Sequence, residues 1–299
     1  MRPPRLATLA LTLLAGPALA GAVVAPTATA ATVLPAACGT PLSDSEIDTI
    51  VRLSDTSAIT GTDPMDRLED EVDRQHRIAT LLVAHRDRRG LFAIGLDAVV
   101  DRAVMPLQRT RGALTTPAWA HLLSTDLLRR YLDNVHAEFT GAPSEPAWQR
   151  YFALSHDCTR SPARTAMVGY NAHLTVDLAR AAAATGTTQQ NVPDFYTIVD
   201  AIASDGAAIV TRTRDVYGAD LGPLWRFYFL GEGLDRLAGQ GVASGLLLRA
   251  ADSGYNTLTL ANGFALQNPQ TAAAAAAEMD ALWATADGAI DVLAQLGGL

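Results

Sequence analysis

A histidine and an aspartate stand four residues apart, at His173 and Asp177, inside an otherwise apolar, alanine-rich stretch. Side chains with this spacing project from the same side of an α-helix, so the imidazole and the carboxylate can share one proton or bind one metal ion. The signatures of common secreted hydrolases are missing: the sequence has no Gly-x-Ser-x-Gly, no His-Glu-x-x-His and no phosphate-binding loop. The pair is therefore the best candidate site in the chain.

Two kinds of chemistry fit this pair. In the first, His173 and Asp177 bind a divalent metal such as zinc, whose open coordination position activates water for hydrolysis. His136 is the candidate third ligand, with Glu138 as an alternative, if the helix that carries them packs antiparallel to the helix of His173. In the second, Asp177 orients His173 as a general base and no metal takes part. Both hypotheses describe a hydrolase.

A structural role is the alternative to catalysis, because buried polar groups need hydrogen-bond partners whether or not they catalyse anything. His173 and Asp177 would then satisfy each other and fix the register of their helix. Asn171, on the opposite side of that helix, would bond to a neighbouring backbone. The protein would be a non-catalytic extracellular binding or envelope-associated protein, with an apolar groove between helices for a small-molecule or lipid-like ligand.

The elements that must position these side chains are helices. Ser43 followed by Glu46 forms a capping box. Apolar residues recur with helical spacing, and alternating β-branched segments joined by hairpin turns are absent. The sequence therefore predicts an all-α, single-domain bundle of roughly eight to ten helices. Four further helix starts place a small polar residue directly before proline, at Asp63-Pro64, Thr116-Pro117, Ser161-Pro162 and Asn268-Pro269.

Two segments near the C-terminal third are ambiguous. The glycine-rich stretch over residues 231–245 follows no strand, so it does not indicate nucleotide binding; two helices in close contact are the favoured interpretation. Trp225, Phe227, Tyr228 and Phe229 form a dense aromatic cluster. A core patch is favoured over a pocket wall for this cluster.

The N-terminal sequence predicts export. Arg2 and Arg5 precede an apolar run and small-residue cleavage contexts, which is typical of a secretory signal peptide over residues 1–30. An extended leader over residues 31–42 and a single helical domain over residues 43–299 follow. No later segment is long and apolar enough for a transmembrane helix. The protein is therefore predicted to be secreted, with association with the cell envelope as the alternative.

The chain contains two cysteines, Cys38 and Cys158. Because an exported chain folds in an oxidising compartment, the two are predicted to form a disulfide. The alternative is acylation of Cys38, since residues 34–38 partly match a lipoprotein cleavage box, and Cys158 would then be free.

Charge disfavours a nucleic-acid partner. Without residues 1–30 the chain has 21 Lys and Arg against 31 Asp and Glu, a net charge of −10. A polyanion needs a concentrated basic surface to overcome such a field. The densest basic cluster, Arg86, Arg88 and Arg89, is short and is broken by Asp87, and we interpret it as a solvated helix end.

The segment around the His/Asp pair resembles a known family. Gly169–Leu178 reads GYNAHLTVDL and resembles the Gly-Met-Asn-Ala-His-Ile-Asn-x-Asp-Leu signature of an uncharacterised actinobacterial family, the domain-of-unknown-function family numbered 5995. Leu128–Val135, followed by Pro146-Ala147-Trp148, resembles a second segment of that family, and Asp194–Asp200 resembles a third. The resemblance covers Leu91–Tyr217 and, more loosely, the C-terminal third.

This resemblance implies a helical fold and an association of Asn171, His173 and Asp177. It implies no particular activity, substrate or cofactor. The chain departs from the family at Val176, where many members carry a second polar residue or histidine before the aspartate. If that residue is a metal ligand, the departure weakens a metal site here.

Overall fold

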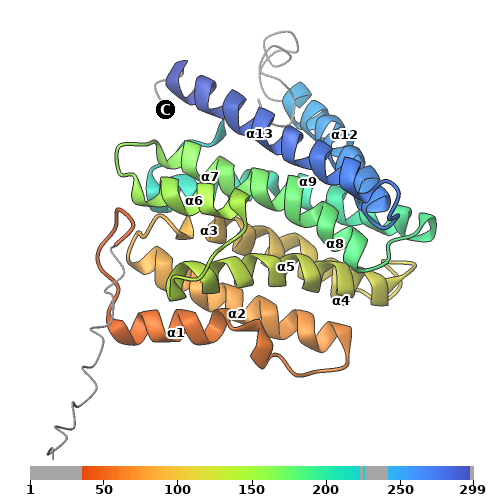
Figure 1. The fold of residues 1–299 in the computed structure, drawn as a ribbon, viewed down its shortest axis with the longest axis horizontal. Helices are drawn as coiled ribbons and strands as arrows, with labels where there is room; N and C mark the ends of the chain where they lie inside the picture. The colour runs from red at the N-terminus through yellow and green to blue at the C-terminus, as the bar shows by residue number, and fades with distance from the viewer. Residues whose placement is uncertain (1–35, 223–224, 226–241, 297–299) are drawn as a thin grey trace, which may run out of the picture. The chain divides into compact units, whose positions relative to one another are not determined.

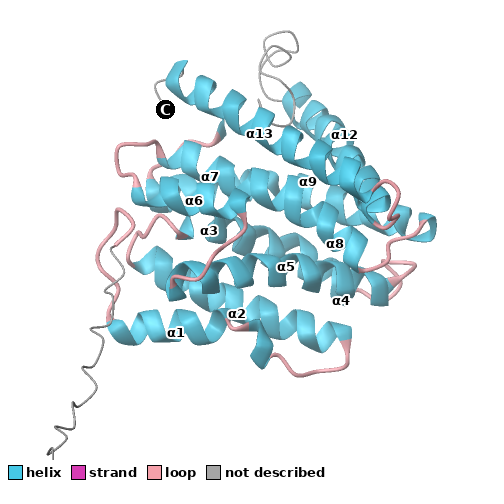
Figure 2. Ribbon diagram, viewed as in Figure 1, coloured by secondary structure: helices cyan, strands magenta, loops and turns pink. Residues whose placement is uncertain are grey.

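Helices account for the regular structure of the part of the chain that this computed structural model describes, residues 36–222, 225 and 242–296, and no strand occurs in those ranges (Figure 2). The all-α prediction is confirmed. The α-helices are α1 (Asp44–Ser54), α2 (Pro64–Ala84), α3 (Gly90–Val99), α4 (Met105–Arg109), α5 (Pro117–Thr140), α6 (Pro146–His156), α7 (Pro162–Asn171), α8 (Leu178–Ala184), α9 (Val192–Tyr217), α12 (Val242–Leu266) and α13 (Ala272–Leu296). Short 3-10 turns are η1 (Thr56–Ala58) and η4 (Gln189–Asn191), and π-helical segments are η2 (Val100–Val104) and η3 (Ala172–Asp177).

Most of the predicted helix starts are confirmed. The Ser43 and Glu46 side chains form the predicted capping box at the start of α1. The Asp63 carboxylate accepts hydrogen bonds from two backbone N–H groups of α2, and the Ser161 hydroxyl accepts one at the start of α7. These side chains satisfy N–H groups that have no partner within their helix. The sequence predicts these helix boundaries because a capping interaction is local in sequence.

Two of the proline starts differ in detail. The helix α5 begins at Pro117 as predicted, but the Thr116 side chain donates to Asp194 Oδ2 (2.6 Å) and does not cap it. The boundary predicted at Pro269 is wrong, because α13 begins three residues later, at Ala272. There the amide oxygen of the Asn268 side chain accepts a hydrogen bond from Gln270 N (3.0 Å), which forms a turn ahead of the helix.

The helices lie in successive layers (Figure 1). α1 and α2 pack on one side of α5, and α2 also packs against α3. α3 in turn contacts α7 and α9, and α13 covers α7, while α12 packs against α8, α9 and α13. The π-helical segment η3 lies among α5, α6, α7, α8, α12 and α13. The candidate pair is thus held at the centre of this arrangement, between layers on both sides.

The predicted disulfide is present between Cys38 and Cys158, whose Cα atoms lie 5.4 Å apart. The alternative of an acylated Cys38 with a free Cys158 is wrong, because both sulfurs are in the bridge. Arg88 supports the same region, since its guanidinium donates to the carbonyl oxygens of Asp157 (3.1 Å) and Arg160 (2.7 Å). These contacts attach the start of the described chain to the loop that follows α6.

The interpretation of residues 86–89 as a solvated helix end is wrong for Arg89. Its side chain is 2 % exposed, and its Nη2 donates to the fully buried Asp87 carboxylate (2.6 Å). The Arg89 guanidinium also lies over the Phe139 ring, 4.2 Å from its centroid. A basic residue can be buried in this way because an acidic residue two positions away neutralises it.

Among the described residues, no helix is long and apolar enough to cross a membrane. The predicted signal peptide and residues 31–35 of the leader lie outside the described residues. So does most of the glycine-rich stretch, of which only the part within α12 is described.

Candidate functional site

The His/Asp pair lies in the π-helical segment η3, between α7 and α8. A π-turn widens the helix and withdraws carbonyl oxygens from the usual hydrogen-bond pattern, and such turns are frequent at functional sites. The Leu174 carbonyl oxygen accepts a hydrogen bond from the Thr259 hydroxyl of α12 (3.1 Å). The Thr175 hydroxyl donates to the Asn171 side chain (2.9 Å). Tertiary and side-chain contacts therefore support a backbone form that the helical spacing alone did not predict.

His173 and Asp177 lie close together, and both are buried, with 5 % and 1 % of their surfaces exposed. The His173 Nδ1 is 3.6 Å from Asp177 Oδ2, which is near enough for electrostatic interaction but too long for a good hydrogen bond. The Asp177 Oδ2 accepts instead from Trp148 Nε1 (2.9 Å). Within the described part of the chain, His173 Nδ1 has no hydrogen-bond partner. The pair is therefore incompletely satisfied.

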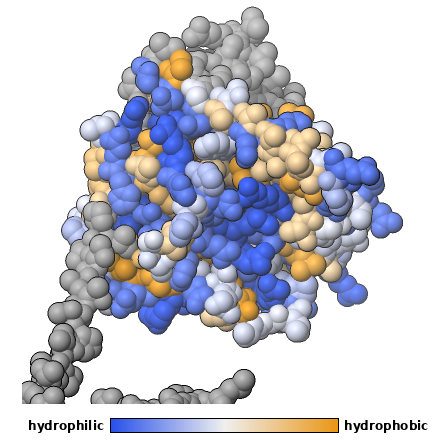
Figure 3. Space-filling model, viewed as in Figure 1, coloured by the Kyte–Doolittle hydropathy of each residue, from blue (hydrophilic) through white to orange (hydrophobic). Residues whose placement is uncertain are grey.

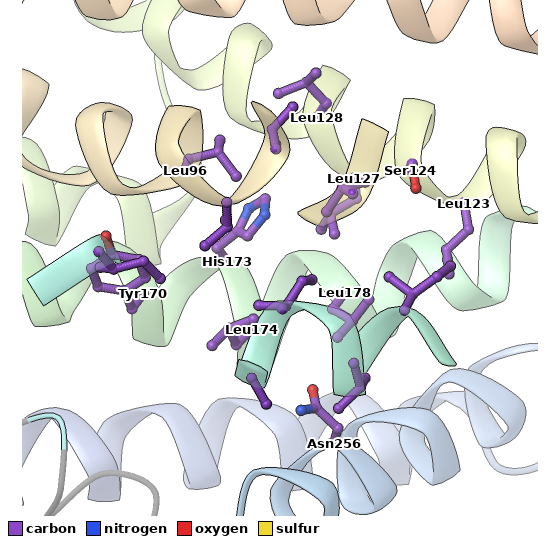
Figure 4. A pocket seen from close by; sticks show the side chains of 18 of the residues that line it. Leu96, Leu123, Ser124, Leu127, Leu128, Tyr170, His173, Leu174, Leu178 and Asn256 are labelled. Carbon is purple, nitrogen blue, oxygen red and sulfur yellow. The ribbon is translucent and has the colours of Figure 1, made fainter. Parts of the chain in front are cut away.

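His173 lines a cavity of about 130 Å³ (Figure 4). The wall is almost wholly apolar, and its few polar side chains include Ser124, Tyr170 and Asn256. In Figure 4 the imidazole lies among leucine side chains from two further helices, Leu96 and Leu127. Such a cavity favours apolar molecules, and His173 and the Tyr170 hydroxyl, which has no hydrogen-bond partner among the described residues, offer them buried polar groups.

Aromatic rings enclose the histidine. The Phe92 ring lies 5.0 Å from the imidazole and Trp148 lies 6.5 Å from it, measured between centroids. Tyr170 packs edge-on against Trp225 at 5.2 Å, and both line the cavity. The core-patch interpretation is incomplete for Trp225, which is buried and also forms cavity wall. Phe227, Tyr228 and Phe229 lie outside the described residues.

Two glycines make room for these rings. A Cβ on Gly169 would lie 2.8 Å from Phe92 Cβ, and a Cβ on Gly95 would collide with the Tyr170 hydroxyl. Real Cβ atoms do not approach so closely, so a larger residue at either position would displace a ring. Both glycines are therefore required by the packing around His173.

The structure does not bring His136 to the pair. Its Nδ1 lies 3.1 Å from the Val51 carbonyl oxygen and 3.3 Å from the Ser54 hydroxyl, so the ring faces α1. The alternative ligand Glu138 lies 2.8 Å from the His156 ring. In the described ranges, no three His, Cys, Asp or Glu side chains are grouped so that they could hold a metal ion. A metal at His173 and Asp177 would lack the third protein ligand that the hypothesis required.

Asn171 bonds across the helix packing. Its Nδ2 donates to the Trp283 carbonyl oxygen of α13 (2.9 Å), and the residue is fully buried. The contact is of the kind expected for a structural role. It connects η3 and α7 to α13 at the turn just before the His/Asp pair.

Sequence reasoning missed Glu71, on the side of α2 that faces α5. The residue is completely buried, and neither carboxyl oxygen has a hydrogen-bond partner among the described residues. Burial raises the pKa of Glu71 to about 8, against the opposing effect of Arg67 and Arg129. Its neighbours Leu68 and Val72 line the cavity. An acidic residue within an apolar stripe was the available signal.

The fold and the site together define a class: an all-helical protein with a buried polar pair beside an apolar cavity. The chain belongs to the family described as a family of unknown function (DUF5995), whose model matches residues 68–244. The resemblance noted from Gly169–Leu178 is thereby confirmed. No curated protein and no solved structure matches the chain.

Proposed function

We propose that the protein binds a small, largely apolar molecule in the cavity beside His173, and that the imidazole forms a hydrogen bond with the one polar group of that molecule. The observation that carries this proposal is the cavity itself, about 130 Å³ with an apolar wall. An apolar cavity of roughly 150 Å³ is sufficient to bind benzene. The ligand, or the part of it that enters, is therefore about the size of one ring or a short acyl chain.

The polar group of the ligand would complete the hydrogen bonding of His173. A buried imidazole nitrogen without a partner costs free energy, and a ligand hydroxyl or carboxyl recovers part of that cost. Because His173 is 5 % exposed, water reaches it little. A few polar groups among apolar walls then select for molecules that carry a matching polar group.

Benzene and phenol are suitable probes, because they differ by one hydroxyl. We expect both to raise the thermal midpoint of the full chain, and phenol to bind several times more tightly, since a net hydrogen bond is worth about 1 kcal/mol. His173→Leu should remove the preference for phenol. If the wild type and His173→Leu each bind benzene and phenol equally well, His173 does not form the proposed hydrogen bond with the ligand.

A filled cavity provides the matched control. Gly206 lines the cavity on α9, and an added Cβ meets only the Trp225 ring, at 3.7 Å. Gly206→Leu should therefore extend into the cavity and abolish benzene binding. Gly288→Leu makes the same change on the exposed face of α13, where an added Cβ meets no atom within 4 Å, and should leave binding unchanged. Benzene binding that survives Gly206→Leu would overturn the cavity proposal.

Hydrolysis without a metal is a second candidate, favoured by the approach of His173 to Asp177. Asp177, held by Trp148, would orient the imidazole as a general base toward a substrate in the cavity. p-Nitrophenyl butyrate tests this candidate: activity should be present in the wild type and lost in His173→Gln. If the wild type does not hydrolyse the ester, the catalytic candidate fails, while benzene binding still decides the first proposal.

Export is also part of the proposed function. It is supported by the signal-peptide pattern of residues 1–30 and by the disulfide between Cys38 and Cys158, since such bridges persist in oxidising compartments. The apolar ligand would then be met outside the cytoplasm.

A further inference from the structure

The apolar cavity beside His173 is longer than it is wide. On α9 its lining residues run from Phe195 to Ile209, a distance of about 21 Å at the rise of an α-helix. On α3 and η2 they run from Phe92 to Val104, over about three turns. A spherical hollow of 130 Å³ would be less than about 10 Å across and could not follow both helices so far. The free space is therefore narrow and runs along these two packed helices.

The end of the cavity near Tyr170 is polar. The Tyr170 hydroxyl is buried and has no hydrogen-bond partner among the described residues. A Cβ on Gly95 would meet both this hydroxyl and Ile209 Cγ2 (2.9 Å), which places the hydroxyl beside the last lining turn of α9. His173 is the next polar side chain along the cavity (Figure 4). Because Asp177 lies near His173 Nδ1, the proton is favoured there, and Nε2 is left as an acceptor.

The opposite end is apolar. Leu123, Leu178 and Phe195 line it, and all three belong to one cluster of buried apolar side chains. Ser124 also lies toward this end (Figure 4), but its hydroxyl already accepts a hydrogen bond from Gln108 Nε2 (2.9 Å). In Figure 3 the middle of the viewed face, where α5 and α8 lie in Figure 1, is strongly hydrophilic. The leucines of α5 and α8 therefore turn their apolar surface inward, to the cavity.

We propose that the ligand of this cavity is an unbranched aliphatic alcohol, with its hydroxyl between Tyr170 and His173 and its chain directed toward Leu123. The ligand oxygen accepts from the Tyr170 hydroxyl and its proton is donated to the imidazole, so both buried groups gain a partner. A chain follows a narrow cavity along its length, whereas a ring fills only one part of it. This ligand class rests on the function proposed above, since it concerns the same cavity.

Charge and volume limit the ligand further. Among the described residues that line the cavity there is no Arg or Lys, so a carboxylate would be buried there without a cation. A neutral hydroxyl avoids that cost. Because an apolar cavity of about 150 Å³ holds the six carbon atoms of benzene, a cavity of 130 Å³ holds a chain of about six carbon atoms.

Calorimetric titration of the full chain with 1-hexanol, and with 1-butanol in competition with it, tests the length of the site. Each buried methylene should strengthen binding about fourfold, so 1-hexanol should bind about fifteenfold more tightly than 1-butanol. Val199 belongs to the apolar end, and Val199→Phe would place a ring there. In that variant 1-butanol should bind as in the wild type, and the ratio should fall below about threefold.

Val292→Phe is the matched control, because Val292 is 54 % exposed on α13, and it should keep the ratio of the wild type. Leu123→Phe narrows the same end from α5 and replaces Val199→Phe if that variant does not fold. At the polar end, Tyr170→Phe should weaken both alcohols about fivefold and leave their ratio unchanged. Sodium hexanoate at neutral pH should bind more weakly than 1-hexanol.

Benzene separates a failure of the chain from a failure of the cavity. If benzene binds and 1-hexanol binds no more tightly than 1-butanol, the aliphatic ligand is wrong while the cavity proposal stands. Equal loss of both alcohols in Val199→Phe would mean a compact cavity and would also overturn it. Tighter binding of hexanoate than of 1-hexanol would overturn the assignment to an alcohol. If neither benzene nor an alcohol binds, the proposed function itself fails.

Discussion

Asp87 and Asp177 are both buried aspartates beside a basic side chain, and their surroundings differ. Asp87 accepts from the backbone N–H of Arg89 (3.0 Å) and from two nitrogens of the Arg89 guanidinium (2.9 and 2.6 Å). It also accepts from Ala37 N (3.4 Å). Asp177 accepts from Trp148, and its basic neighbour His173 lies 3.6 Å away. Both carboxylates are buried, but only the first is fully hydrogen-bonded.

The difference separates structural from functional polar groups. The Asp87 and Arg89 pair lies beside the disulfide and joins the start of the described chain to α3, so every bond it makes supports the fold. In the His173 and Asp177 pair, His173 Nδ1 has no hydrogen-bond partner among the described residues, and each of the two side chains lines a hollow. A polar group that is buried, poorly satisfied and next to a cavity is a candidate for ligand contact.

Replacing Arg89 should give the largest loss in the free energy of unfolding. Arg89→Met leaves the Asp87 carboxylate buried without its cation, and breaking a buried pair in this way costs about 3–5 kcal/mol. Urea denaturation of the full chain measures the loss. Arg77→Met is the control, because Arg77 and Asp73 form an exposed pair, and its effect should stay within about 0.5 kcal/mol. A loss below about 1 kcal/mol for Arg89→Met would mean that the Asp87 and Arg89 pair is not structural.

Glu71 extends the comparison to a carboxyl group with no hydrogen-bond partner in the described structure. Because burial raises its pKa to about 8 in the folded state, its contribution to stability is complete below its ordinary pKa of 4.5 and is lost as the pH rises toward 8. By pH 7 the loss is on the order of 3 kcal/mol. Glu71→Gln should remove this dependence and make the protein more stable at pH 7.

Urea denaturation at pH 5 and pH 7 measures the change for Glu71. The control is Glu69→Gln on the same helix, where the carboxylate is exposed and pairs with Arg109 (2.9 Å). That variant should keep the pH dependence of the wild type. If the free energy of unfolding of Glu71→Gln changes between pH 5 and pH 7 as it does in the wild type, Glu71 is not the group that causes the pH dependence.

Local patterns explain how far the sequence predicted the fold. The capping residues Ser43, Asp63 and Ser161 were found because each contacts a backbone within three residues of itself. The helix start predicted at Pro269 is wrong because the Asn268 side chain forms a turn before the helix begins. Local chemistry thus identifies the helices, and it is least informative where one polar residue can form two motifs.

The candidate site was predicted only in part, for the same reason. The His173 and Asp177 spacing is visible in sequence, whereas Trp148 lies 29 residues from Asp177 and contacts it only through the packing of α6. His136 was expected to approach the pair, yet α5 turns it toward α1. The rotation of a helix depends on its neighbours, and the two hollows arise from several elements at once.

The smallest predicted effect distinguishes the two pairs directly. We expect a double-mutant cycle with His173→Leu and Asp177→Asn to give a coupling energy below about 1 kcal/mol, because 3.6 Å is too long for a strong hydrogen bond. The matched cycle with Asp87→Asn and Arg89→Met should give about 2 kcal/mol or more, since those side chains form two close contacts. Urea denaturation of the single and double variants measures both. If the two coupling energies are equal, His173 and Asp177 stabilise the fold as Asp87 and Arg89 do, and the contrast between a structural and a ligand-binding pair is lost.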